Sequence, residues 1–156
     1  MAGASETAMA SSASSRTFPL KTADFCAQVD GVDTHFAVTI YSNSVLALIT
    51  QTGTLGSIAE AQWDGPLPGG APLRADSAVD ADRPLGGCFS VRTLLGASDD
   101  ALLHVCAQQV ASHGIRRGGL HDRRFIVCLG LAKQRRSDAA HLRALLDRAF
   151  ESSIWG

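Results

Sequence analysis

Residues 32–58, VDTHFAVTIYSNSVLALITQTGTLGSI, contain the pattern on which the fold prediction depends. Apolar and mostly polar side chains alternate over residues 32–41, which is the period of a β-strand. Ser42 and Asn43 follow, and both residue types tolerate turn geometry. The β-branched and leucine-rich run at 44–50 then reads as a second strand. The stretch therefore predicts two consecutive antiparallel strands joined by a tight turn.

The glycines of QTGTLGSI, Gly53 and Gly56, could belong to a phosphate-binding loop or to a turn between strands. A P-loop needs a lysine and a following helix, and a GxxG clamp on nucleic acid joins two helices. Neither context is present, since a further strand is predicted at 55–61. We therefore predict a hairpin here, in which Gly53 supplies a positive φ angle and Gly56 marks a bulge or a close backbone approach.

The rest of the chain adds two strands and two helices to this meander, which begins with a strand at 21–31. The predicted elements are a loop at 63–87, a strand at 88–95, a helix from the cap Ser98 to Gly114, a strand at 123–132 and a helix after the cap Ser137. This order predicts an α+β fold, with an antiparallel sheet of about six strands and two helices on one face.

The two sides of the predicted sheet differ in what can cover them. A two-residue turn at 42–43 would pair Ile40 with Val45 and Thr39 with Leu46, and opposed residues share a face. One face is then fully apolar and suits the helices. The other face is half apolar, and two helices cannot also cover it, so we expect another subunit's sheet there. The expected partner-binding residues on that face are Ala37, Thr39, Tyr41, Leu46 and Leu48.

The composition is that of one ordinary globular domain. Hydrophobic residues make up 46% of the 156 residues and charged residues 19%. Residues 1–16 are rich in Ala and Ser and are predicted to be a disordered tail without a secretory signal. Residues 17–156 are predicted to form a single domain with a long flexible loop at 63–87. No apolar run reaches the roughly 18 residues of a membrane span.

Charge is divided unevenly along the chain. Residues 1–82 contain three Lys or Arg and nine Asp or Glu, whereas residues 83–156 contain eleven and six. Basic side chains gather at both ends of the predicted strand at 123–132, with Asp122 as the only acid among them. They are either solvated turn residues or a surface for an acidic partner. This basic cluster consists of Arg116, Arg117, Arg123, Arg124, Lys133, Arg135 and Arg136.

No catalytic or metal-binding motif stands out. The cysteines Cys26, Cys88, Cys106 and Cys128 lack the spacing of a zinc site, and they favour a reducing compartment. We expect no cofactor, no metal and no membrane partner. Nucleic acid is not expected either, because no strand with stacking aromatic residues accompanies the basic cluster. The alternatives left open are a small enzyme with a site under the 63–87 loop and an RNA-binding α+β module.

Three stretches, taken in order, carry a family resemblance. They are VLALITQTGTLGSI at 45–58, VRTLLGASDDALLHVCAQQVAS at 91–112, and the ending with FIVCLGLA at 125–132, a leucine-rich helix and Trp155. Together they resemble the proteasome assembly chaperone 3 family, over about residues 20–62 and 88–156. The tail and the Pro- and Gly-rich loop at 63–87 depart from that family.

The resemblance implies a non-catalytic chaperone for assembly of the 20S proteasome. It implies a heterodimer with a subunit like proteasome assembly chaperone 4, and a homodimer in isolation is the alternative. The dimer would bind α-subunits, help the α-ring to close in order and leave when β-subunits arrive. The expected location is the cytoplasm, with the nucleus as a second compartment.

Overall fold

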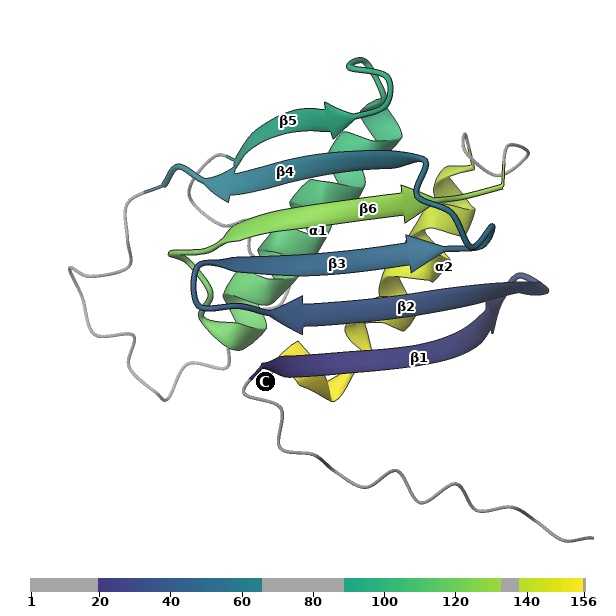
Figure 1. The fold of residues 1–156 in the computed structure, drawn as a ribbon, viewed down its shortest axis with the longest axis horizontal. Helices are drawn as coiled ribbons and strands as arrows, with labels where there is room; N and C mark the ends of the chain where they lie inside the picture. Colours follow the sequence, from purple (N-terminus) through teal and green to yellow (C-terminus); the bar gives the residue numbers. More distant parts are fainter. Residues whose placement is uncertain (1–19, 66–88, 133–137, 156) are drawn as a thin grey trace, which may run out of the picture.

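The computed structural model describes residues 20–65, 89–132 and 138–155. These residues form six strands, two α-helices and a final 3₁₀ turn, η2 (Figure 1). The elements in chain order are β1 (Lys21–Val29), β2 (Val32–Ile40), β3 (Ser44–Thr50), β4 (Ser57–Trp63), β5 (Phe89–Leu95), α1 (Ala101–Gly118), β6 (Arg124–Gly130), α2 (Ala139–Phe150) and η2 (Ser153–Trp155). The predicted α+β class is confirmed. The predicted tail at 1–16 and most of the predicted loop at 63–87 lie outside the described residues.

The sheet has the strand order β1-β2-β3-β6-β4-β5 and is mixed. Strand β6 lies between β3 and β4, parallel to β3 and antiparallel to β4 (Figure 1). All other neighbours are antiparallel, and the predicted register of Ile40 with Val45 and Thr39 with Leu46 is confirmed. The predicted four-strand meander is wrong after β3, because β6, which is apolar on both sides, lies between β3 and β4.

The predicted hairpin at QTGTLGSI is therefore wrong as well. The loop from Gln51 to Gly56 passes over the end of β6 rather than joining two paired strands. The backbone N–H groups of Gln51 and Gly56 donate to the carbonyl oxygens of Gly130 and Leu129, at 2.8 and 3.0 Å. Gly53 has the expected positive φ of 69°. The loop fits because Gly130 has no side chain, since a Cβ there would lie 1.9 Å from the Thr54 carbonyl oxygen.

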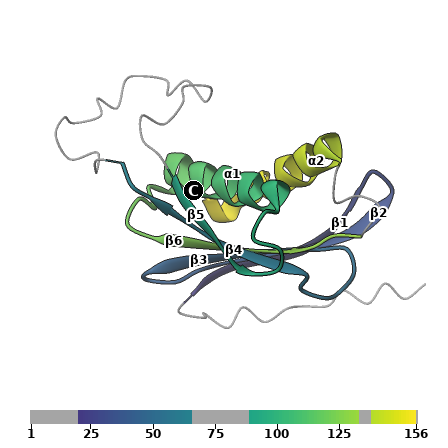
Figure 2. The ribbon, with the colours of Figure 1, turned by 90° about the horizontal axis from the view of Figure 1, so that it is seen from above.

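Both helices cover the same face of the sheet, as predicted (Figure 2). Their apolar stripes meet the alternating inward residues of the central strands, and the core contains Phe36, Val45, Leu103, Phe125 and Leu145. Phe25 of β1 extends this core, because its ring stacks on Phe36 with centroids 4.9 Å apart. Neither described helix lies on the opposite face of the sheet.

Helix α1 begins and ends later than the sequence predicted. Its N-cap is Asp100, whose carboxylate accepts from the backbone N–H of Leu103 at 3.1 Å, rather than Ser98. Gly114 does not end the helix. It lies inside it and permits close packing, since a Cβ there would lie 2.5 Å from the Phe125 ring. The helix ends at Gly119, which has the left-handed conformation typical of this position.

Helix α2 is capped by Asp138, while the predicted cap Ser137 lies outside the described residues. His141 in its first turn is fully buried and links three elements. Its Nδ1 lies 2.7 Å from Asp30 of the β1–β2 turn, and its Nε2 lies 2.8 Å from the Gln51 amide. The amide also donates to Thr34 at 3.2 Å. This chain of hydrogen bonds satisfies polar groups that would otherwise be costly to bury.

His113 of α1 lies against the C-terminal part of the chain. Its ring stacks on Phe150, with centroids 4.0 Å apart, and meets Trp155 edge-on. Its Nε2 is buried and has no hydrogen-bond partner among the described residues. Burial, followed by the charges of Arg117 and Arg116, lowers the pKa of His113 from 6.5 to about 4. The folded protein therefore holds this ring neutral.

We predict that Gly130→Ala destabilises the protein far more than Gly53→Ala. The added methyl group at 130 collides with backbone, and overpacking of this kind costs about 3 kcal/mol. Gly53 has open space around its Cβ position, so its substitution costs only the strain of a positive φ, about 1 kcal/mol. Urea denaturation of both variants measures the difference. Equal losses of stability in the two variants would show that the loop does not pack closely against Gly130.

We predict that His113 weakens the fold as the pH falls from about 6.5 to about 4. The unfolded chain binds a proton in this range and the folded chain does not, so stability falls with falling pH. His113→Phe keeps the ring stack and removes the titration. At full effect this change in pKa is worth about 3 kcal/mol. Because the ring is only partly buried, solvent screening reduces the extra loss that we expect for the wild-type protein to about 2 kcal/mol across the window. The measurement is the free energy of unfolding of both proteins by urea denaturation at several pH values. If the two free energies fall in parallel with pH, the prediction is wrong.

Candidate partner-binding surfaces

The face of the sheet without helices has an apolar centre. Strand register places Ala37, Leu48, Cys128 and Ile58 in one row across β2, β3, β6 and β4. A second row passes from Leu46 to Ile126 on the adjacent strand. Residues in register share a face and pack side by side. We call this surface the sheet patch, and it consists of Ala37, Leu46, Leu48, Ile58, Ile126 and Cys128.

One flank of the sheet patch is basic and is organised by Glu60 of β4. The Glu60 side chain is only 10% exposed, and its Oε2 accepts from Nη2 of Arg92 at 2.7 Å. Arg124 of β6 lies 3.9 Å from Oε1 of the same carboxylate. Both arginine side chains are more than half exposed. Two cations thus surround one buried acid, and this flank keeps a net positive charge.

The other flank, on β1 and β2, is polar, and the described residues of these strands that share its face include no Lys or Arg. Thr22 and Thr39 face each other in register, with their hydroxyl oxygens 3.4 Å apart. In the next rows Asp24 pairs with Ala37, and Cys26 lies opposite His35, with 3.9 Å between Sγ and Nε2. An apolar centre between two polar flanks of different charge is typical of a protein-binding surface.

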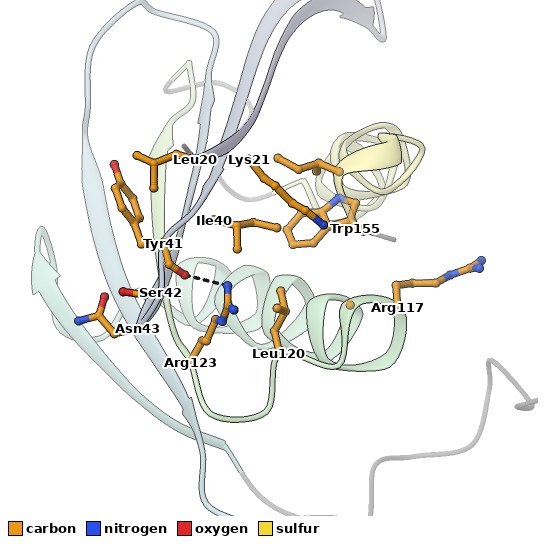
Figure 3. A pocket seen from close by; sticks show the side chains of 12 residues that line it. Leu20, Lys21, Ile40, Tyr41, Ser42, Asn43, Arg117, Leu120, Arg123 and Trp155 are labelled. Carbon is orange, nitrogen blue, oxygen red and sulfur yellow. Dashed lines mark hydrogen bonds between the residues drawn. The ribbon is translucent and has the colours of Figure 1, made fainter. Parts of the chain in front are cut away.

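The structure places four of the five residues predicted for this face together. Ala37, Leu46 and Leu48 belong to the sheet patch, and Thr39 adjoins it. Tyr41 lies beyond the end of β2 and is 37% exposed, with its side chain on the side of the strand away from Ile40 and Trp155 (Figure 3). Whether these residues meet a partner stays a prediction.

Sequence reasoning missed Ile58, Ile126 and Cys128 as members of this surface. A signal was present, because residues 125–132 are apolar at both alternating sets of positions. The residues could not be assigned while β6 was placed away from β3. Strand β6 contributes Ile126 and Cys128, and it also brings Ile58 of β4 beside them.

The predicted basic cluster does not form a single patch in the described residues. Arg124 lies on the open sheet face with Glu60, whereas Arg123 donates from Nη1 to the Tyr41 carbonyl oxygen at 2.7 Å. Arg116 and Arg117 belong to the last turn of α1, and Arg117 is the more exposed. The remaining members, Lys133, Arg135 and Arg136, lie outside the described residues and follow the opposite end of β6 in the chain.

Hollows in the described surface also lie outside the sheet patch. A cleft of about 650 Å³ lies between the β2–β3 turn, the end of α1 and η2, and it includes Tyr41, Arg117 and Arg123 (Figure 3). A groove of about 530 Å³ lies between α1 and α2, with Val105 and Leu142 in its lining. Both are candidate contact sites in addition to the sheet patch.

The titratable side chains of the described core are engaged in packing. Burial, with a smaller effect of Asp100, raises the pKa of the Cys106 thiol to about 12, and burial also raises the pKa of Cys128. Neither thiol is therefore a ready nucleophile. Over residues 20–65, 89–132 and 138–155, no three metal-ligating side chains come together. Within the same ranges, no helix has both the length and the apolar character of a membrane span.

Comparison with known proteins identifies the family. The model of the family described as proteasome assembly chaperone 3 matches residues 47–151, well over half of the chain. The chain belongs to the proteasome assembly chaperone 3 family. As a member, it is a chaperone of proteasome assembly. The match begins within β3 and includes all of β4, β5, α1, β6 and α2.

A solved structure supports the same fold. The chain resembles a protein in the crystal structure of a novel chaperone complex for yeast 20S proteasome assembly, with a TM-score of 0.59 and 18% identity. The similarity covers 86% of this chain and 98% of the other. A comparison with curated proteins finds no match to this sequence.

Proposed function

We propose that this chaperone acts by binding alone, as a dimer whose two sheets pack face to face across the sheet patch. The observation that carries the proposal is an apolar sheet centre that neither described helix covers. Both faces of a sheet with such a centre are normally covered. Membership in a family of assembly chaperones supports binding rather than catalysis as the mode of action.

The size of the open face fits this role. Six strands about 4.8 Å apart and about seven residues long present a surface of roughly 600 Å². A standard interface buries about 800 Å² on each partner. Sheet packing, with some help from the flanking loops, is thus sufficient for a stable dimer.

We propose a related chaperone, like proteasome assembly chaperone 4, as the partner across the sheet. A heterodimer is supported by the basic flank with Arg92 and Arg124, which favours an acidic surface on the opposing sheet. A second copy of this chain is the alternative occupant in isolation. The similar yeast protein was crystallised in a chaperone complex.

The proposed client is the 20S proteasome, through its α-subunits. A rigid dimer that holds neighbouring α-subunits in register offers the next subunit an ordered surface. Each addition then costs less translational and rotational entropy than association of free subunits. This templating is how the chaperone would promote ordered closure of the α-ring.

The client assignment is tested by affinity purification of the tagged chain and mass spectrometry of co-purifying proteins. We expect 20S α-subunits and one related small chaperone in near-equal amounts. Recovery of the chaperone without α-subunits would contradict the proposed client. Recovery of neither would contradict the proposed function as a whole.

The dimer assignment predicts the effect of charge on the sheet patch. Leu48→Asp or Ile126→Asp places an unpaired charge in a dry interface and should abolish dimer formation. Val105→Asp is the matched control, because Val105 is 46% exposed on α1 and lies outside the patch. Light scattering at micromolar concentration measures the oligomeric state of each variant, both by itself and with the co-purified partner. Circular dichroism checks that each variant is folded.

Dimers that persist in both patch variants would show that the partner binds elsewhere. Loss of the dimer in Val105→Asp alone would instead assign the interface to the helices.

A further inference from the structure

The cleft beside the β2–β3 turn is separate from the sheet patch. It is formed where the end of β2, the end of α1, the start of β6 and η2 converge (Figure 3). Its volume of about 650 Å³ is large enough for several amino-acid residues. Gly118 allows the end of α1 to lie close to η2, since a Cβ there would lie 3.1 Å from the Trp155 carbonyl oxygen.

The charged residues that line this cleft in the described part of the chain are all cations: Lys21, Arg117 and Arg123. Arg123 is fixed by its hydrogen bond to the Tyr41 carbonyl oxygen, and its Nε is buried without a hydrogen-bond partner among the described residues. Asp122 lies 3.9 Å from this Nε, but its side chain is 76% exposed and does not line the cleft. Among the described residues that line it, the cleft therefore has positive charge without an acidic side chain to neutralise it.

The wall beside these cations is apolar. Ile40 and Leu120 point into the space between Arg123 and Trp155 (Figure 3). Leu120 is 8% exposed and Trp155 is 2% exposed, so both side chains are held by packing. A ligand that fits this lining combines an apolar group with negative charge on either side of it.

These features favour a peptide over a nucleic acid. Binding of single-stranded nucleic acid depends on aromatic rings that accept stacked bases. The Trp155 ring is buried, and its indole N–H donates to the Ala149 carbonyl oxygen at 3.0 Å. Tyr41 is exposed, but its ring lies on the side of the strand away from Ile40 and Trp155 (Figure 3). A small inorganic anion would leave most of the volume and the apolar wall unused.

We propose that this cleft binds an acidic peptide segment of a client protein, with carboxylates at Lys21, Arg117 and Arg123 and one aliphatic or aromatic side chain against Ile40 and Leu120. The inference goes beyond the proposed function, because it does not depend on which protein covers the sheet. It gives the chaperone a second contact point, at one end of the sheet rather than on its face.

The test uses a rhodamine-labelled peptide, Asp-Glu-Leu-Glu-Asp, and fluorescence anisotropy with the purified full-length protein. We expect saturable binding that weakens severalfold when salt is raised from about 50 to about 500 mM, because salt screens exposed charges. Lys21→Glu and Arg117→Glu should each weaken binding at least tenfold. The neutral peptide Asn-Gln-Leu-Gln-Asn should bind at least tenfold more weakly than the acidic one.

Arg143→Glu is the matched control, since Arg143 is an exposed cation on α2 that lines the helix groove instead of the cleft. It should change binding less than twofold, and Arg117→Lys should retain most of the affinity. Leu48→Asp should also bind the peptide normally, which separates this inference from the dimer proposal.

Three results would overturn the inference: no saturable binding at millimolar peptide, equal binding of the neutral peptide, or affinities unchanged by both Lys21→Glu and Arg117→Glu. Loss of peptide binding in Leu48→Asp would do the same by assigning the peptide to the sheet face. Tighter binding of a uridine octanucleotide at the same residues would assign the cleft to nucleic acid instead.

Discussion

Strand β6 occupies the centre of the sheet, and the other elements are arranged around its need to bury both faces. Phe125, Val127 and Leu129 are buried under the helices, while Ile126 and Cys128 lie on the opposite face. The strand hydrogen-bonds in parallel to β3 and antiparallel to β4, so it separates two strands that are consecutive in the chain. The loop that links β3 to β4 must therefore cross the end of β6, and it can do so because Gly130 has no side chain.

This central position also produces the sheet patch. Without β6, the apolar residues of β3 and β4 would not form a continuous surface. With it, Leu48, Cys128 and Ile58 lie in one row across three strands. The helix layer covers the other face. The result is a domain with an apolar surface that a second sheet can cover, flanked by a buried acid and two exposed arginines.

Several histidines and cysteines of the described core are part of its packing. His141 is held between Asp30 and Gln51, and His113 is stacked on Phe150. The thiols of Cys106 and Cys128 have raised pKa values. The candidate contact sites on the described surface are the apolar sheet face, the groove between α1 and α2 and, at one end of the sheet, the basic cleft near Tyr41. A dimer formed through the face would leave the cleft available for a further partner.

Local pattern determined the existence and type of every described strand and helix, because alternation and helical spacing depend only on neighbouring residues. It also determined the register of β2 with β3, since a tight turn at Ser42 and Asn43 fixes that pairing. The helix ends were less well determined. The sequence predicted Ser98 as the N-cap of α1, but the cap is Asp100. Gly114 was predicted to end the helix, whereas it lies inside the helix and allows Phe125 to pack closely.

Strand order was decided only by the tertiary structure. A strand that is apolar on both faces is stable in the centre of a sheet. Its sequence does not determine which strands lie beside it, because hydrogen bonds between strands use backbone groups that all residues share. Ile58, Ile126 and Cys128 thus joined the candidate surface only once β6 was placed. The tertiary structure also separated Arg124 from Arg123. Successive side chains along an extended chain point to opposite faces, and only the complete sheet shows what lies on each face.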